Sequence, residues 1–245
     1  MTIELNKIIL GNCLDVMQDI PDGSVDAVIC DPPYQITACS WDSIIPLEPM
    51  WKHLKRIIKP NGAIVMTASQ PFTTTLISSN MGMFKYDLVW HKTQPSGHLN
   101  AKIMPLRGHE DIIIFCNGKT TYNPEMRKGK YRFKGNKGQA KGRCYGESKS
   151  YGVYNDEYYP TSILTMGNAD QRNKVHPTQK PVALFEYLIR TYTNKGDLVL
   201  DFAAGSGTTG VACRNIHRNF ILIEKEQKYV DIANQRISQA QPQLF

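Results

Sequence analysis

Residues 25–34 read Val-Asp-Ala-Val-Ile-Cys-Asp-Pro-Pro-Tyr, a mostly apolar run that ends in an acid, two prolines and an aromatic residue. Such a run is typical of a strand buried on both faces, as in a parallel sheet. The prolines favour an extended backbone, so we expect Asp31 and the Pro32 carbonyl on a stiff turn at the strand's carboxyl end. Ligands bind at that edge of open α/β sheets. The two acceptors and the Tyr34 ring suit an exocyclic amino group on a flat base, although an ordinary strand and turn would also fit.

Length and composition favour one large α/β domain, or one domain with a sizeable insertion. The chain has 245 residues, and 41% of them are hydrophobic, which is enough for a full core. It begins without a signal-peptide pattern, and no apolar run approaches the roughly 20 residues of a spanning helix, so we expect a cytoplasmic protein without a membrane segment. The six cysteines are scattered without a C-x-x-C pair, which indicates neither a zinc site nor a disulfide framework.

The positive charge is concentrated in one segment. The formal net charge is +7, and residues 117–175 carry this whole excess, with twelve Lys and Arg against five Asp and Glu. Between residues 118 and 152, glycine, basic and aromatic residues alternate with almost no aliphatic residue, so the segment cannot build a core of its own. A solvated loop is one interpretation, but charges interleaved with rings also suit a nucleic acid. The residues expected to bind a nucleic acid are Lys128, Lys130, Arg132, Lys134, Lys137, Lys141 and Arg143.

Outside this segment strands and helices alternate, which predicts an α/β fold with a mainly parallel sheet. Strands are expected at residues 8–10, 25–30, 63–67, 87–90, 111–115, 198–201 and 220–223, with a polar loop between 90 and 111. Helices are expected at residues 13–20, 46–58, 71–79, 182–192, 207–215 and 227–239. We therefore expect one domain made of residues 1–116 and 176–245, interrupted by an inserted region of residues 117–175.

A glycine-rich loop follows the last strand but one. Residues 201–210 read Asp-Phe-Ala-Ala-Gly-Ser-Gly-Thr-Thr-Gly, and glycines at a helix start let the backbone approach a ligand closely. Glu224, at the end of the next strand, suits ribose hydroxyls. NAD fits this pattern, but a carboxylate at Asp201 would repel a pyrophosphate and attract an ammonium or sulfonium group. S-adenosylmethionine (SAM) carries both of these cations and a ribose.

With these motifs in this order, the chain resembles the amino-methylating DNA methyltransferases of the β permutation class, including forms common in phages and prophages. The resemblance rests on residues 31–34, on residues 176–181 (His-Pro-Thr-Gln-Lys-Pro), on residues 201–209 and on the basic segment between. It implies a doubly wound, mainly parallel, Rossmann-like methyltransferase sheet of seven strands with one reversed strand. It also implies methyl transfer from SAM to a base flipped out of DNA, as in restriction-modification, with residues 117–175 as the target-recognition region.

The resemblance also assigns the site residues. The catalytic residues are expected to be Asp31, Pro32, Pro33 and Tyr34. The cofactor site is expected to comprise Asn12, Asp31, His176, Thr178, Lys180, Asp201, Phe202, Ala203, Gly205, Ser206, Gly207 and Glu224, and no residue is expected to bind a metal. The chain departs from the family at two positions, because Phe202 follows Asp201 without the usual proline and Asn12 replaces the usual aspartate.

The preferred interpretation is an adenine-N6 methyltransferase acting on double-stranded DNA, because an aspartate such as Asp31 at the first motif position favours adenine in the family. Cytosine-N4 methylation needs the same geometry and is the alternative within the class. An NAD-dependent oxidoreductase and a non-catalytic nucleic-acid-binding protein are the alternatives from other classes. Family members are often dimers, and nothing in the sequence decides whether this chain forms a homodimer.

Overall fold

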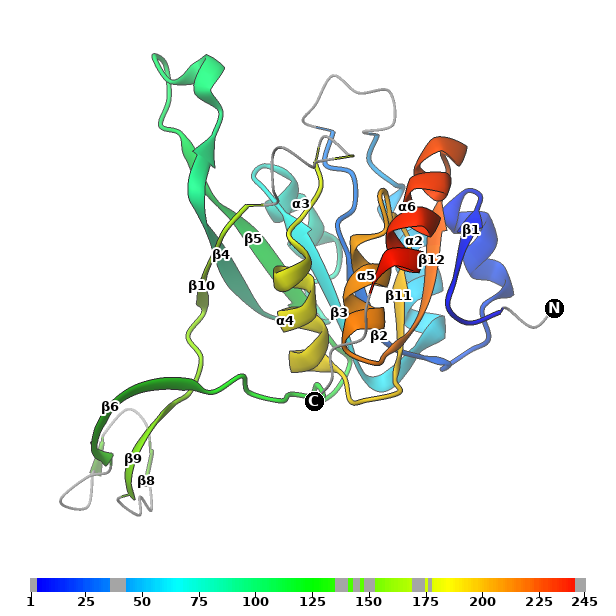
Figure 1. The fold of residues 1–245 in the computed structure, drawn as a ribbon. Helices are drawn as coiled ribbons and strands as arrows, with labels where there is room; N and C mark the ends of the chain where they lie inside the picture. The colour runs from blue at the N-terminus through cyan, green and yellow to red at the C-terminus, as the bar shows by residue number, and fades with distance from the viewer. Residues whose placement is uncertain are drawn as a thin grey trace. The chain divides into compact units, whose positions relative to one another are not determined.

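The chain folds into two compact units, one of residues 1–123 with 162–245 and one of residues 124–161 (Figure 1). The structure is a computed structural model. It describes residues 4–35, 43–134, 141–142, 146–147, 153–168, 175 and 178–240. Each unit is described by itself below.

The larger unit is built on one sheet, with the strand order β1-β12-β11-β2-β3-β5-β4-β10. These strands are β1 (Lys7–Leu10), β2 (Val25–Cys30), β3 (Ile58–Ala68), β4 (Phe84–Ser96), β5 (Arg107–Phe115), β10 (Ile163–Met166), β11 (Leu198–Asp201) and β12 (Asn219–Glu224). Neighbours pair in parallel except at β5, which runs antiparallel to both β3 and β4. The predicted α/β fold with a mainly parallel sheet and one reversed strand is therefore confirmed.

The sheet has eight strands among the described residues, whereas seven were expected. The additional strand is β10, which pairs in parallel with β4 at the edge of the sheet. Its residues fall within the segment 117–175, in which no strand was expected. A four-residue strand with a single buried side chain, Leu164, leaves little periodic signal in the sequence.

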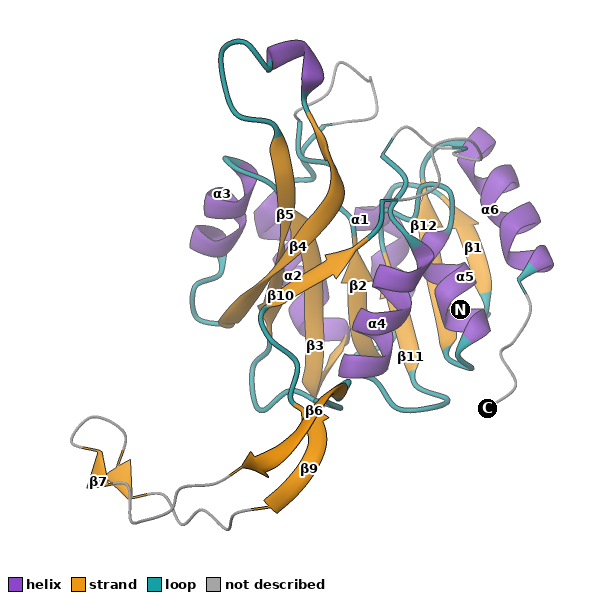
Figure 2. Cartoon of the chain, turned by 60° about the vertical axis from the view of Figure 1, so that its left-hand side comes forward, coloured by secondary structure: helices purple, strands orange, loops and turns teal. Residues whose placement is uncertain are grey.

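Helices cover both faces of the sheet (Figure 2). They are α1 (Cys13–Val16), α2 (Leu47–Ile57), α3 (Phe72–Ser79), α4 (Val182–Tyr192), α5 (Thr208–Asn215) and α6 (Gln227–Gln239), with 3-10 turns at Met17–Asp19 and His98–Asn100. One apolar cluster joins α2 and α3 to Val28 of β2, and a second joins α4, α5 and α6 to Ala27 of β2. Successive side chains of β2 thus enter different cores, which explains its almost uninterrupted apolar sequence. No helix of the described part is long and apolar enough to cross a membrane.

Strands β4 and β5 are longer than the sequence indicates. They take up half of the polar loop expected between residues 90 and 111 and form a hairpin that projects beyond the other strands in Figure 1. Lys92 and Glu110 stand in these extensions and form an ion pair of 2.5 Å. Charged residues predict a loop when they are solvated, but Lys92 and Glu110 are largely shielded from solvent and paired, so the loop is shorter than expected and comprises residues 97–106.

The smaller unit is a hairpin of β6 (Arg127–Lys134) and β9 (Val153–Tyr158), with a short pair formed by β7 (Lys141–Gly142) and β8 (Gly146–Glu147). Every residue in it whose exposure is described is exposed or half-buried. Its side chains contact one another in pairs: Tyr131 stacks on Tyr154, and the Arg132 guanidinium lies 5.0 Å from the centre of the Tyr158 ring. The hairpin thus has side-chain contacts but no buried core.

Gly207, at the start of α5, is expected to tolerate no side chain. Its φ is +75°, and a Cβ added there would lie 2.7 Å from the Cβ of Ala233 in α6. We expect Gly207→Ala to lower the free energy of unfolding by about 2–4 kcal/mol, from left-handed strain and overpacking together. Equilibrium urea unfolding measures this change. Gly196→Ala is the control, because Gly196 has a φ of +87° but nothing within 4 Å of an added Cβ. Equal losses in the two variants would contradict the role of α5–α6 packing.

Candidate active site

The carboxyl ends of the central strands border a cavity of about 750 Å³. Small-molecule sites typically measure roughly 300–1,000 Å³. Residues 31–34, which follow β2, line this cavity together with residues 201–206, which follow β11, and Glu224, which ends β12. Strands β2 and β11 are parallel neighbours, as are β11 and β12. Parallel neighbours end at the same edge, so the sheet brings together three motifs that are far apart in the sequence.

The Asp31 carboxylate is bound by three side chains. Its Oδ1 accepts hydrogen bonds from the Tyr34 hydroxyl at 2.6 Å and from the Thr67 hydroxyl. Lys180 Nζ lies 2.7 Å from the carboxylate and donates to Oδ2. An ionised carboxylate has about four acceptor positions, so these three bonds leave one on Oδ2. Asp31 is partly exposed and lines the cavity, so this position can receive a donor bound there.

Tyr34 is fixed by its neighbours. Its ring stacks on Phe72 with 5.3 Å between the ring centroids, and Lys180 Nζ lies 5.4 Å from its centre. Burial, reinforced by the negative charge of Asp31, raises the pKa of the Tyr34 hydroxyl well above its ordinary value. The hydroxyl therefore remains protonated and donates to Asp31, which helps to fix the orientation of the carboxylate.

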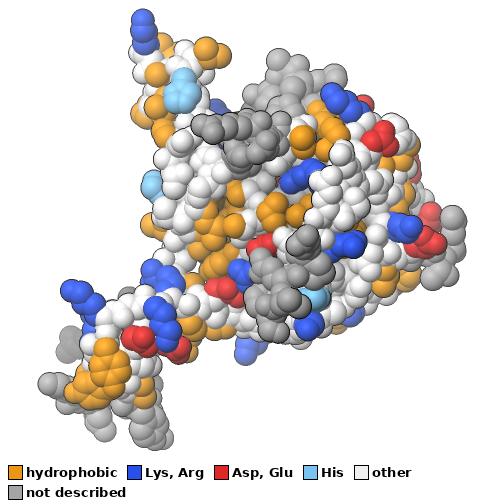
Figure 3. Space-filling model, in the orientation of Figure 1, with side chains coloured by type: hydrophobic (Ala, Val, Ile, Leu, Met, Phe, Trp, Pro, Cys, Tyr) orange, Lys and Arg blue, Asp and Glu red, His pale blue; other side chains and the backbone are white. Residues whose placement is uncertain are grey.

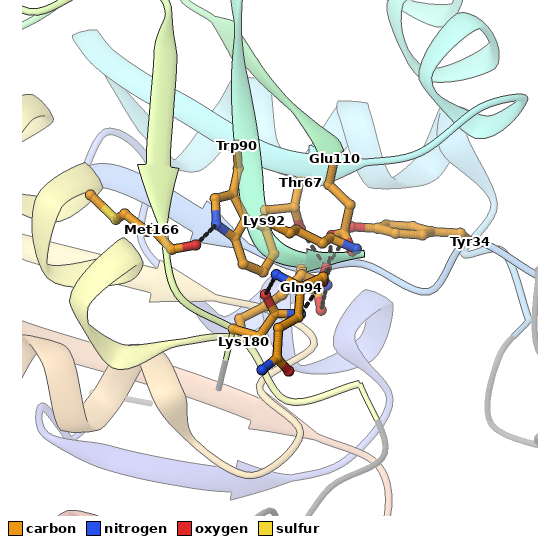
Figure 4. A network of polar contacts seen from close by, with 10 residues as sticks. Tyr34, Thr67, Trp90, Lys92, Gln94, Glu110, Met166 and Lys180 are labelled. Carbon is orange, nitrogen blue, oxygen red and sulfur yellow. Dashed lines mark hydrogen bonds and ion pairs between the residues drawn. The ribbon is translucent and has the colours of Figure 1, made fainter. Parts of the chain in front are cut away.

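Two further charged residues, Glu110 and Lys92, extend the contacts of Lys180. The sequence did not predict a role for either. Glu110 of β5 lies 3.2 Å from Lys180 Nζ and 2.5 Å from Lys92 Nζ of β4 (Figure 4). Burial alone would lower the pKa of Lys180, but the carboxylates of Asp31 and Glu110 raise it above its ordinary value. Burial alone would raise the pKa of Glu110, but the ammonium groups of Lys180 and Lys92 lower it. Lys180 and Glu110 are therefore both charged near neutral pH.

One signal in the sequence points to Glu110. It lies two residues before the buried apolar run that ends β5, and Asp111 stands between them. An acid so close to a buried run needs a partner of opposite charge. That partner cannot be identified from the sequence alone, because Lys92 and Lys180 belong to other elements.

Asp201 holds the start of the glycine loop. Its carboxylate accepts a hydrogen bond from the Ala203 N–H at 3.1 Å and another from the Thr209 hydroxyl in α5. It is 3% exposed, and this burial raises its pKa to about 6. The acid thus joins the end of β11 to both the loop and the helix that follows.

Glu224 holds the same loop from the neighbouring strand. One carboxylate oxygen accepts the Gly205 N–H at 2.8 Å, and the other accepts the Glu226 N–H at 2.9 Å. Each oxygen keeps a further acceptor position, and the residue lines the cavity. The role in binding ribose that the sequence predicts for Glu224 is compatible with this second role in shaping the loop.

Most of the other predicted residues also border the cavity. Those that line it are Asn12, Asp31, Pro32, Pro33, Tyr34, Thr178, Lys180, Asp201, Phe202, Ala203, Gly205, Ser206 and Glu224. Gly207 does not line it and packs against α6 instead. Asn12 also caps α1, because its side chain accepts the Leu14 N–H at 2.9 Å. His176 lies outside the described residues.

The lining suits SAM. The acids Asp31, Asp201 and Glu224 provide negative charge for a cationic cofactor, and Phe202 and Tyr229 provide apolar surface for a base. Within the described ranges, no group of three or more His, Cys, Asp or Glu residues could hold a metal ion. The cavity thus places groups suited to a nucleoside cofactor beside an acceptor suited to an amino group, as a group-transfer reaction requires.

Comparisons with known proteins identify the family. The model of the N6/N4 DNA methylases matches residues 25–235. The type II methyltransferase M.HinfI of Haemophilus influenzae is 26% identical over 97% of this chain and 70% of its own length. M.BglII of Bacillus subtilis is 29% identical over 96% of this chain and 69% of its own length. The chain therefore belongs to the N6/N4 DNA methylase family.

Solved structures agree with this assignment. The crystal structure of the M1.HpyAVI–SAM complex matches with a TM-score of 0.66 and 27% identity, over 94% of this chain and 98% of the other. The cytosine-N4-specific PvuII DNA methyltransferase matches with a TM-score of 0.68 and 18% identity, over 96% and 87%. The prediction of a DNA methyltransferase with SAM as its cofactor is confirmed at the level of the class.

The raised pKa of Asp201 predicts a pH-dependent cost to stability. The pKa rises from 3.8 to about 6 on folding, so between these values the folded state binds more protons than the unfolded state. Stability contributed by this group therefore falls as the pH rises through that window. Asp201→Asn removes the titration, so the stability of the variant relative to wild type should rise by on the order of 2–3 kcal/mol between about pH 4 and pH 7. Urea unfolding at the two pH values measures it, and a constant difference would contradict the buried, titrating carboxylate.

Proposed function

We propose that the protein transfers a methyl group from SAM to the N6 amino group of adenine in double-stranded DNA. The observation that carries this proposal is the acceptor position that remains on Asp31 Oδ2, facing the same cavity as the glycine loop. Family membership supports the class of reaction. The geometry supports the roles of the individual residues.

Asp31 and the Pro32 carbonyl would activate the target. A base amino group is a poor nucleophile because its lone pair is delocalised into the ring. Accepting both of its N–H groups, one at Asp31 Oδ2 and one at the Pro32 oxygen, localises the lone pair on nitrogen. When bound, SAM supplies an electrophilic methyl group on sulfur. The protein's contribution is therefore positioning and electrostatics, without a covalent protein intermediate.

The target base must leave the helix to reach this turn, because its amino group lies inside the duplex. Tyr34 would stack on the flipped base. Phe72 stacks on the Tyr34 ring and Lys180 Nζ lies 5.4 Å from the ring centre, so the base would use the ring surface that these two residues leave uncovered. Lys180 and Thr67 both donate hydrogen bonds to the Asp31 carboxylate. In this proposal they orient Asp31 and do not contact the base.

Adenine is favoured over cytosine by the aspartate at the first motif position, and cytosine-N4 methylation is the alternative. Nucleoside mass spectrometry of DNA treated with the enzyme and SAM separates the two. N6-methyladenine as the product supports the proposal. N4-methylcytosine as the product would replace it with the alternative.

Asp31→Ala is expected to abolish methyl transfer while the protein remains folded. Loss of one acceptor aimed at the reacting group typically costs about 3–4 kcal/mol of transition-state stabilisation. The rate of N6-methyladenine formation measures the effect, and thermal unfolding verifies the fold. Asp22→Ala is the matched control, since Asp22 is an exposed acid paired with Arg56. Near wild-type turnover in a folded Asp31→Ala protein would reject the mechanism.

We also propose that residues 117–175 contact the DNA. Figure 3 shows basic side chains beside apolar ones on the unit of residues 124–161. Lys128, Lys130 and Arg132 are exposed on β6. Lys128 lies 3.2 Å from Asp156 and 3.1 Å from Glu157, so its charge is partly balanced before DNA binds. Lys137 and Arg143 lie outside the described residues, as do the side chains of Lys134 and Lys141.

Replacing Lys128, Lys130 and Arg132 together with glutamine is expected to weaken DNA binding and flatten its salt dependence. Each lost phosphate contact reduces the slope of log K against log salt by about 0.9, and Lys128 should contribute least because of its acidic neighbours. Fluorescence anisotropy over a salt series measures the slope, and calorimetry should show unchanged SAM affinity. The matched control replaces the exposed Lys52, Lys55 and Lys59. An unaltered slope in the β6 variant would show that this strand does not contact phosphates.

A further inference from the structure

Four charged side chains form a continuous series of contacts that ends at the catalytic turn. Lys92 and Lys180 both contact Glu110, at 2.5 Å and 3.2 Å, and Lys180 also contacts Asp31 at 2.7 Å. We call these four residues the charge chain. Positive and negative groups alternate along it, and their formal charges sum to zero. Figure 4 shows Lys92, Glu110 and Lys180 close together, from β4, β5 and the segment before α4.

Three members of the charge chain are largely buried, and the fourth, Asp31, is 20% exposed. The side chains of Lys92 and Lys180 are 8% and 7% exposed, and that of Glu110 is 15% exposed. Water and salt screen such charges weakly. Removing one member therefore leaves an uncompensated charge that the remaining members feel strongly. The catalytic carboxylate is one of those members, so a change at Lys92 or Glu110 must alter the electrostatics at Asp31.

Lys180 is shared between two carboxylates. If it donated to Asp31 alone, its positive charge would hold electron density on that carboxylate and weaken the hydrogen bond that Asp31 accepts from the target amino group. Glu110 attracts Lys180 away from Asp31. Lys92 in turn offsets part of the negative charge of Glu110 and so limits this attraction.

We propose that Glu110 and Lys92 are positioning residues for the methyl transfer. By their opposite charges they set how strongly Lys180 pairs with Asp31, and hence how well Asp31 accepts the target amino group. This inference rests on the proposed function, because it takes Asp31 as the acceptor. It assigns a role in the reaction to two residues that need not touch either the cofactor or the target atom.

Among the described residues, three other titratable groups act on Asp31. Tyr34 and Cys30 belong to the same segment, and Asp201 lies at the end of the neighbouring strand β11. Thr67 also binds the carboxylate but does not titrate. These residues are unchanged in the variants described next, so differences between variants report on Glu110 and Lys92.

The test is the pH dependence of kcat, whose acid limb reports the protonation of the essential carboxylate. Glu110→Gln leaves Asp31 as the sole carboxylate beside two ammonium groups, so the acid limb should move to lower pH by roughly one unit. In this variant Lys180 pairs with Asp31 alone, so Asp31 accepts the target amino group less well. We therefore expect kcat to fall by up to about a hundredfold with little change in KM. Lys92→Met leaves two carboxylates sharing one ammonium group, so the acid limb should move by a similar amount to higher pH. The double variant, Glu110→Gln with Lys92→Met, leaves one positive and one negative group, Lys180 and Asp31. Its acid limb should therefore return toward the wild-type position.

A merely structural role would not produce these opposite displacements. Shifts in the same direction, no shift, or a double variant that stays displaced would overturn the inference. If a single variant does not fold, Glu110→Asp retains the charge but retracts the carboxylate, and it should give a smaller displacement in the direction of Glu110→Gln. An unmoved limb in a folded Glu110→Asp protein would also overturn it. Lys92→Arg preserves the charge and should restore the wild-type profile.

Controls separate this inference from the proposed function. Glu48→Gln and Lys59→Met make the same chemical changes at exposed positions and should leave the profile unchanged. Asp31→Ala is measured in parallel. If Asp31→Ala remains active, the proposed function fails. If Asp31→Ala is inactive while the charge-chain variants keep the wild-type acid limb, only the present inference fails.

Discussion

The parallel pairing of β2 with β11 is the constraint on which the site depends. Because both strands run in the same direction at the centre of the sheet, their carboxyl ends place Asp31 and Asp201 at one edge. The glycine loop and the catalytic turn then open into a single cavity. Their order along the chain has no influence on this result. Only the strand order matters, so a sequence with its catalytic motif first can build the same kind of site as one with its cofactor motif first.

The acids of the site also serve the fold. Asp201 and Glu224 use their oxygens to hold backbone N–H groups of the loop, and Asp31 is oriented by Tyr34, Thr67 and Lys180. Burying so many charges costs free energy unless each is paired and hydrogen-bonded. An interior of this kind is better explained by the reaction that it supports than by stability, since apolar residues would fill the same space at lower cost.

The sequence predicted those parts of the fold and site that rest on local signals. The apolar run before Asp31, the two prolines after it and the glycines after Asp201 each act through their own backbone conformation, so their positions could be inferred. Lys92 and Glu110 could not, because a charged residue in a strand looks like a loop residue until its partner is known. The short strand β10 was not predicted for a related reason, since it is defined by its pairing with β4 more than by its own four residues.

The sheet order has a consequence for how the protein is made. Among the described strands, β1 pairs with β12 alone, and the Phe220 N–H bonds to the Asn6 side chain across 214 positions. During synthesis, β1 therefore cannot form this pairing until residues 219–224 have been made. Nascent chains with such long-range pairing fold late and expose unpaired edges meanwhile. Until β12 has been made, the unpaired edge of β1 is therefore a place where the new chain can pair wrongly.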